Sequence, residues 1–144
     1  MPLIDNYLLD NCAIDGPSLE LESTLNGTLN IVAEDGVARN SPQNSYGKVK
    51  AIQVGYKGKY RVITVTNAST SLSSDCRIAV YVNGIYQGVS FVVPINTGSQ
   101  TFEVTVNAGD SIEVWAYYTG GFSYNISRVT LYSSLAPVGK FTLT

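Results

Sequence analysis

The stretch "AVYVNGIYQGVSFVV", residues 79–93, alternates apolar residues with polar or small ones on both sides of Asn83-Gly84. A two-residue turn between strands needs positive φ at both central positions, which Asn and Gly tolerate best. The stretch therefore predicts a β-hairpin in which Tyr81 faces Tyr86. The same register pairs Val82 with Ile85, Val80 with Gln87, Ala79 with Gly88 and Ile78 with Val89.

The predicted hairpin has two unlike faces, because successive side chains of a strand point to opposite sides. One face is aliphatic and is expected to pack on a core. It carries Ile78, Val80, Val82, Ile85, Val89 and Phe91. The other face carries Tyr81 and Tyr86 among small residues, which is unusual for a face in contact with water.

The rest of the chain continues the strand-and-turn pattern. Only 14% of the 144 residues are charged, whereas about 25% is usual, and the length corresponds to one domain. Alternating segments recur between turns rich in Gly, Pro and Asn, which predicts an all-β protein. They include "KVKAIQV", "KYRVITVTN", "YNISRVTLY" and "TFEVTVNAGDSIEVWAYY", the last expected to form a hairpin around residues 107–110. We therefore expect an antiparallel β-sandwich, jelly-roll-like, of about nine or ten short strands.

The segment "SIEVWAYY" places further aromatic residues outside the expected core. If Ile112 and Val114 point inward, Trp115 and Tyr117 point outward. Tyr81, Tyr86, Trp115 and Tyr117 are then the candidate interaction residues, since outward aromatics are enriched where a second surface docks. The alternatives are that the parity is inverted or that the N-terminal segment covers these rings. Protein contact ranks above sugar stacking here, because the sequence locates no convergent polar groups.

Charge is segregated along the chain, although the net charge is only −2. Every charged residue in 1–35 is acidic, and every charged residue in 36–61 is basic. This pattern predicts that the first segment lies against the basic one, in the same or a neighbouring copy, unless both are simply solvated. The candidate electrostatic residues are Asp5, Asp10 and Asp15 on one side and Lys48, Lys50, Lys57, Lys59 and Arg61 on the other.

Two parts of the chain are expected from these patterns. Residues 1–47 read as an acidic extended leader with a possible hairpin around Asn26-Gly27, and serve as a docking or exchange arm. Residues 48–144 form the β-sandwich domain. The start lacks the basic and apolar regions of a signal peptide, and no apolar run is long enough to span a membrane. We therefore expect synthesis in a cytoplasm.

Most kinds of catalytic or metal site are disfavoured by composition. The chain has no histidine, which excludes Ser/His/Asp and Cys/His catalysis and argues against zinc. Glu103 and Glu113 are the alternative carboxylate pair of a small enzyme, but their parity is that of solvent-facing acids. Cys12 and Cys76 are expected to be free thiols, with a disulfide as the alternative. We predict no enzyme activity, no cofactor, no metal and no nucleic-acid partner.

The runs "GKVKAIQVGYKGKYRVITVTN", "CRIAVYVNGIYQGV" and "FEVTVNAGDSIEVWAYYTGG" together resemble a β-sandwich domain of bacteriophage and other virion structural proteins. The resemblance covers residues 47–132 and consists of strands and turns. It implies a virion location and a capsid decoration protein, oligomeric with a trimer favoured, whose partner is the major capsid or another virion protein. The alternative is a receptor- or carbohydrate-binding head of a phage fibre, with a glycan as ligand.

Overall fold

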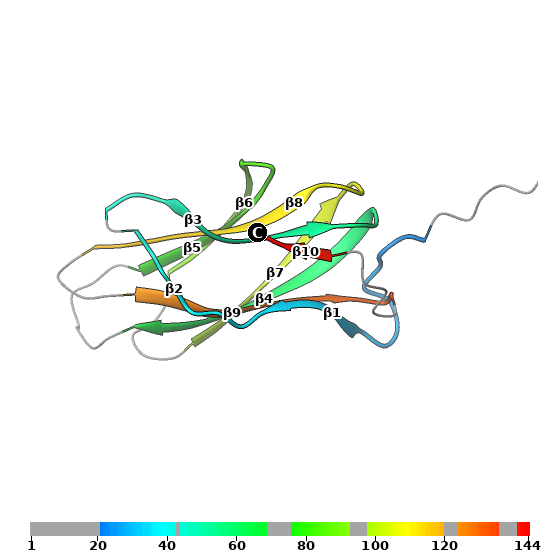
Figure 1. Ribbon diagram of the computed structural model, residues 1–144, viewed down its shortest axis with the longest axis horizontal. Coiled ribbons are helices and arrows are strands. Elements are labelled where there is room, and N and C mark those ends of the chain that lie inside the picture. The colour runs from blue at the N-terminus through cyan, green and yellow to red at the C-terminus, as the bar shows by residue number, and fades with distance from the viewer. Residues whose placement is uncertain (1–20, 43, 69–75, 93–97, 120–123, 136–140) are drawn as a thin grey trace, which may run out of the picture.

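The computed structural model describes residues 21–42, 44–68, 76–92, 98–119, 124–135 and 141–144. These residues form ten strands, arranged in two five-stranded sheets whose strand pairs are antiparallel. Figure 1 shows the two sheets as two layers lying one over the other. The predicted all-β, antiparallel sandwich is thus confirmed. No helix able to cross a lipid bilayer occurs in the part of the chain that the structure describes.

The strands are divided between sheet A and sheet B. Sheet A has the order β1 (Asn30–Asp35), β9 (Tyr124–Ser133), β4 (Gly58–Ala68) and β7 (Gly98–Val106), and β2 (Arg39–Asn40) also pairs with β9. Sheet B has the order β10 (Phe141–Leu143), β3 (Gly47–Val54), β8 (Ser111–Tyr118), β5 (Cys76–Val82) and β6 (Ile85–Val92). Because the chain alternates between the sheets from β2 to β5 and from β6 to β10, the sandwich is jelly-roll-like.

The core lies between the sheets and follows the predicted alternation. In β8, Ile112, Val114 and Ala116 are buried, as their parity predicts. Further buried apolar side chains come from both sheets: Ile52, Val62, Ile78, Val80, Phe102, Ile126 and Leu131. Cys76 is also buried, whereas Cys12 lies outside the described residues, so the choice between free thiols and a disulfide stays a prediction.

The β5–β6 hairpin confirms the turn but corrects the register beyond it. Asn83 and Gly84 both have positive φ, 50° and 78°, and Tyr81 pairs with Tyr86. A shift between Ala79 and Tyr81 then pairs Ala79 with Ser90, so the predicted partners of the residues before Tyr81 are wrong. Ile85 was expected on the inward aliphatic face, yet it is 68% exposed, because it begins the edge strand of the sheet beside the turn.

The described part of the predicted leader belongs to the sandwich. β1 pairs with β9, so residues 30–35 form no hairpin with the residues before Asn26-Gly27. Instead, Ser23 bridges Gly58 of β4: its amide donates to the Lys57 carbonyl (2.8 Å), and the Lys59 amide donates to its carbonyl (2.8 Å). The predicted hairpin is therefore wrong, because β4 supplies better partners. Residues 1–20 lie outside the described residues, and their role as an arm stays a prediction.

The turn at residues 107–110 crosses between the sheets. β7 lies in sheet A and β8 in sheet B, so the expected hairpin of these two strands is wrong. The turn is fixed instead to the end of β3, because Gly109 donates to the Val54 carbonyl (2.8 Å) and Val54 donates to the Asp110 carbonyl (2.9 Å). This crossing decides which acidic residues share a face of the molecule.

Candidate functional site

The outer face of sheet B gathers the four aromatic residues predicted from the sequence. Tyr81 of β5 and Trp115 of β8 stack with their ring centroids 4.5 Å apart and their planes at 25°. Tyr86 of β6 lies 5.5 Å from Tyr81, tilted by 54°. Tyr117 follows on β8, on the same face as Trp115, because residues 115 and 117 alternate with the buried core residues.

A fifth aromatic residue, Tyr46, also belongs to this group. The sequence pattern did not predict this. Its ring meets that of Tyr117 edge to face, 4.6 Å between centroids and 81° between planes. Tyr46 precedes β3, where Gly47 pairs with Ala116 of β8, so one more step of this register brings Tyr46 beside Tyr117. We call Tyr46, Tyr81, Tyr86, Trp115 and Tyr117 the outer-face cluster.

Glu113 fixes the orientation of the tryptophan. The Trp115 indole N–H donates to Glu113 Oε2 at 2.7 Å, and Lys48 Nζ lies 3.5 Å from Glu113 Oε1. Glu113 is only 6% exposed, so it holds the ring from beneath rather than facing solvent. Because Glu113 and Trp115 have the same parity on β8, the sequence could have indicated that Glu113 lies beside the Trp115 ring.

The groups left open to solvent combine apolar area with polar atoms. Tyr86 is 48% exposed, and the Lys48 side chain is 52% exposed. Burial raises the pKa of the Tyr81 hydroxyl, and the nearby hydroxyls of Tyr46 and Tyr86 raise it further. Tyr81 therefore stays un-ionised at neutral pH and presents a hydroxyl that can donate as well as accept.

Lys50 pairs with an acidic residue of segment 1–35, as the charge pattern predicts for the basic segment, but the pair is buried. A register shift between Lys48 and Lys50 leaves Lys48 opposite Trp115 on the outer face but Lys50 opposite Val114, facing the core. Lys50 is buried, and its Nζ lies 3.0 Å from Asp35 Oδ1. The bulge therefore removes Lys50 from any outer surface, although simple alternation places it beside Lys48.

Lys59 and Arg61 lie on the opposite side of the molecule from the outer-face cluster. On sheet A, Lys59 Nζ is 2.8 Å from Glu103 Oε2, and Arg61 Nη2 is 3.0 Å from Glu103 Oε1. Hydrogen bonds from Lys59 and Arg61 lower the pKa of Glu103. Among the described residues, the ion-pair partner of both is therefore Glu103 of β7. Asp5, Asp10 and Asp15 lie outside the described residues, and their contacts stay a prediction.

The alternative carboxylate pair is not assembled. Glu103 lies on the outer face of sheet A, whereas Glu113 lies on the outer face of sheet B, with the core between them. Across the described ranges, no group of three or more Asp, Glu or Cys side chains is placed to bind a metal ion. Glu103 and Glu113 therefore do not form the pair of neighbouring carboxylates that glycoside hydrolysis requires.

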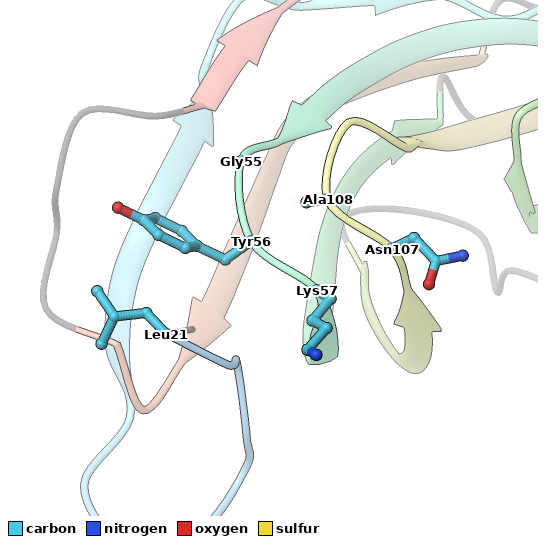
Figure 2. Close-up of a pocket in the computed structure, with 6 residues that line it drawn as sticks. All are labelled: Leu21, Gly55, Tyr56, Lys57, Asn107 and Ala108. Atoms are coloured by element: carbon cyan, nitrogen blue, oxygen red, sulfur yellow. The ribbon is translucent and has the colours of Figure 1, made fainter. Parts of the chain in front are cut away.

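Lys57, the remaining basic candidate, lines a separate pocket. This cavity of about 310 Å³ is bounded by Leu21, Gly55, Tyr56, Lys57, Asn107 and Ala108. Figure 2 shows the Tyr56 ring and the Leu21 side chain near each other, while the Asn107 side chain points away from both. Three of the six lining residues are polar, but the Asn107 side chain does not converge with the others, so the outer-face cluster is the better candidate for a binding site.

The structure is similar in overall shape to several solved structures. No protein-family model matches the chain, and no curated protein matches it. A family 35 carbohydrate-binding module from an environmental isolate shares 14% identity with a TM-score of 0.49, over 83% of this chain and 94% of that one. A family 35 module from Clostridium thermocellum shares 11% identity with a TM-score of 0.46, over 73% and 98%.

A third similar structure is the carbohydrate-binding module CBM36 in complex with calcium and xylotriose. It shares 13% identity with a TM-score of 0.47, over 76% of this chain and 96% of that one. These structures are not virion proteins, and the resemblance to virion domains finds no support in them. With TM-scores below 0.5, the likeness is one of general shape.

Proposed function

We propose that the chain is a non-catalytic carbohydrate-binding module that holds a sugar chain on the outer-face cluster. Carbohydrate binding is part of the sequence-based alternative to a capsid role, there in the form of a phage-fibre head. The observation that carries the proposal is the row of rings from Tyr86 through Tyr81 to Trp115, fixed on three neighbouring strands beside the exposed ammonium of Lys48. The proposal rests on these side chains.

The chemistry of a sugar suits this surface. A pyranose ring has apolar C–H faces and a rim of hydroxyl groups, so its receptor needs flat apolar area next to hydrogen-bonding groups. Aromatic rings give such area at low entropic cost, because few torsions are fixed on binding. The exposed faces and edges of the row can contact the C–H groups, while the Lys48 ammonium can donate charge-assisted hydrogen bonds to hydroxyl oxygens.

The cluster is also ordered before any ligand arrives. Trp115 is held by its hydrogen bond to Glu113 and by the stack with Tyr81, and Tyr117 is held against Tyr46. A site that is already in its bound geometry loses little entropy on binding. The cluster can therefore bind a ligand without first ordering its own side chains.

The proposal is tested with a glycan array, followed by calorimetric titration of the oligosaccharides that bind. We expect Trp115→Ala to weaken binding at least tenfold, which corresponds to about 1.4 kcal/mol. Tyr132→Ala is the matched control, because Tyr132 is a partly buried aromatic on sheet A, away from the cluster. Binding that persists in the Trp115→Ala variant, or a wild-type chain that retains no glycan, would falsify the proposal.

A further inference from the structure

Strand β6 is an edge of sheet B with features that edges usually lack. It pairs with β5 on one side, and no strand among the described residues pairs with its other side. Such an edge presents unpaired N–H and C=O groups to any strand that approaches. Proteins usually protect edges by making them short, by placing charges on them or by bulges.

The other three edges of the sandwich carry this protection. β10 has only three residues. β1 carries Glu34 and Asp35, and β7 carries Glu103. β6 carries a register shift, between Tyr86 and Ser90, but its eight residues, "IYQGVSFV", include no charge, and it exposes Ile85 (68%) and Tyr86 (48%) at its start. This edge is therefore the one suited to pairing with another strand.

We propose that β6 pairs antiparallel with β6 of a second copy, which gives a two-fold dimer whose B sheets are continuous. An uncharged strand can pair with its own copy without like-charge repulsion, whereas charges on an edge strand would repel the same charges on the second copy. Antiparallel pairing about a two-fold axis also lets each copy offer the same backbone donors and acceptors to the other. A dimer differs from the trimer favoured by the sequence.

The dimer extends the candidate site across both copies. A two-fold axis perpendicular to the joined sheet keeps both outer faces on the same side. The rows of rings then meet at the β6 edges, and each copy contributes its Tyr86 to one surface. From Trp115 of one copy to Trp115 of the other there are five strand spacings, roughly 24 Å at ~4.8 Å each. This step rests on the proposed function, and it names a chain of several sugars as the ligand.

The dimer itself is tested by sedimentation of the full chain over a series of concentrations. We expect dimers at tens of micromolar, and we expect Gln87→Lys, which places a charge on the exposed part of β6, to raise the dimer dissociation constant at least ~tenfold. Thr101→Lys is the matched control, because it places the same charge at an exposed position of β7 on the other sheet. Backbone amides of β6 should also exchange more slowly as concentration rises.

The outcomes separate the dimer from the glycan function. A wild-type chain that stays monomeric, forms trimers, or dimerises equally well as the Gln87→Lys variant overturns the dimer. A dimer that binds no glycan supports the edge pairing while the proposed function fails. The shared surface is overturned if long oligosaccharides bind no more tightly than short ones. It is also overturned if their gain in affinity is the same in Gln87→Lys as in the wild-type chain. In both cases the proposed function stands.

Discussion

The ammonium of Lys50 lies 3.0 Å from Oδ1 of Asp35, and both side chains are buried between the sheets. Lys50 Nζ also donates to the backbone carbonyls of Asp35 and Val37. Because Asp35 ends β1 of sheet A and Lys50 belongs to β3 of sheet B, this ion pair joins the two layers seen in Figure 1. A buried charge is tolerated only where its partners are this close.

Removing one charge of this pair should destabilise the fold strongly. We expect Lys50→Met to lower the free energy of unfolding by about 3–5 kcal/mol, because it leaves a buried carboxylate without its closest cation. Urea denaturation measures this change. Lys59→Met, at a half-exposed lysine, should cost no more than about 1 kcal/mol. Equal losses in the two variants would contradict the structural role of Lys50.

Stability should depend on acid through Asp35. Burial raises the pKa of Asp35, but hydrogen bonds from the Val37 amide and Lys50 outweigh it, so the pKa lies below its ordinary value. A carboxyl group whose pKa is lowered by folding stabilises the fold at every pH above its pKa in the unfolded chain. This stability is lost as the pH falls through the pKa of the folded state. Urea denaturation from pH 7 downward should show a steep loss below about pH 4.

The control for this acid dependence is Asp35→Asn. The variant is less stable at neutral pH, but its free energy of unfolding should change less between about pH 4 and 2 than that of the wild-type chain. Glu103→Gln should remove a smaller part of the slope, because the Glu103 carboxyl is exposed. If Asp35→Asn has the same slope as wild type, another carboxyl carries the acid sensitivity.

Gly58 should resist replacement because of its backbone and its neighbour. Its φ is +125°, and a Cβ there would lie 2.1 Å from the Ser23 carbonyl oxygen. Gly58→Ala should lower the free energy of unfolding by about 1–3 kcal/mol or more. Hydrogen exchange should also show faster exchange of the Lys59 amide, which donates to that carbonyl. Gly27→Ala, with φ +73° but open space around the added Cβ, is the control with the smaller loss.

Trp115, the single tryptophan, should report on Glu113 by fluorescence. Glu113→Ala removes the acceptor of the indole N–H, so we expect stronger quenching of the emission by acrylamide and a loss of about 1–3 kcal/mol in stability. Glu113→Gln keeps an acceptor oxygen and should stay near wild type. Glu103→Ala, on the other sheet, should leave the emission unchanged. Acrylamide quenching in Glu113→Ala equal to that of the wild-type chain would show that the hydrogen bond does not hold the ring.

Local patterns predicted much of the fold and the aromatic part of the site. Asn83-Gly84 dictates its own backbone conformation, so the β5–β6 turn follows from two residues. Alternation along β8 separates Val114 from Trp115 without knowledge of any other strand. Both inferences need only the chemistry of a few neighbouring residues, which is why they hold.

The features that the sequence did not predict are contacts between residues far apart in the chain and a local break in strand alternation. The pairing of β1 with β9 and the contact of Ser23 with Gly58 join distant segments, and no local pattern reports them. The bulge between Lys48 and Lys50 turns two lysines of equal parity to opposite faces. Alternation fails at such a point, so the sequence places Lys50 on the same face as Lys48 and does not predict that its ion pair is buried.

The side-chain amide of Asn83 is held at both of its ends. Its Nδ2 donates to Asp110 Oδ1 at 2.8 Å, and its Oδ1 accepts from the Ser111 amide at 2.8 Å. An asparagine followed by glycine normally deamidates with time, because the next backbone nitrogen attacks the side-chain carbonyl to form a succinimide. Both asparagines that precede a glycine are exposed, but Asn83 is kept from that cyclisation by its two side-chain hydrogen bonds, whereas the described residues offer the Asn26 side-chain amide no such pair of bonds. Chemical ageing of the chain should therefore begin at Asn26 and spare the hairpin that carries Tyr81 and Tyr86.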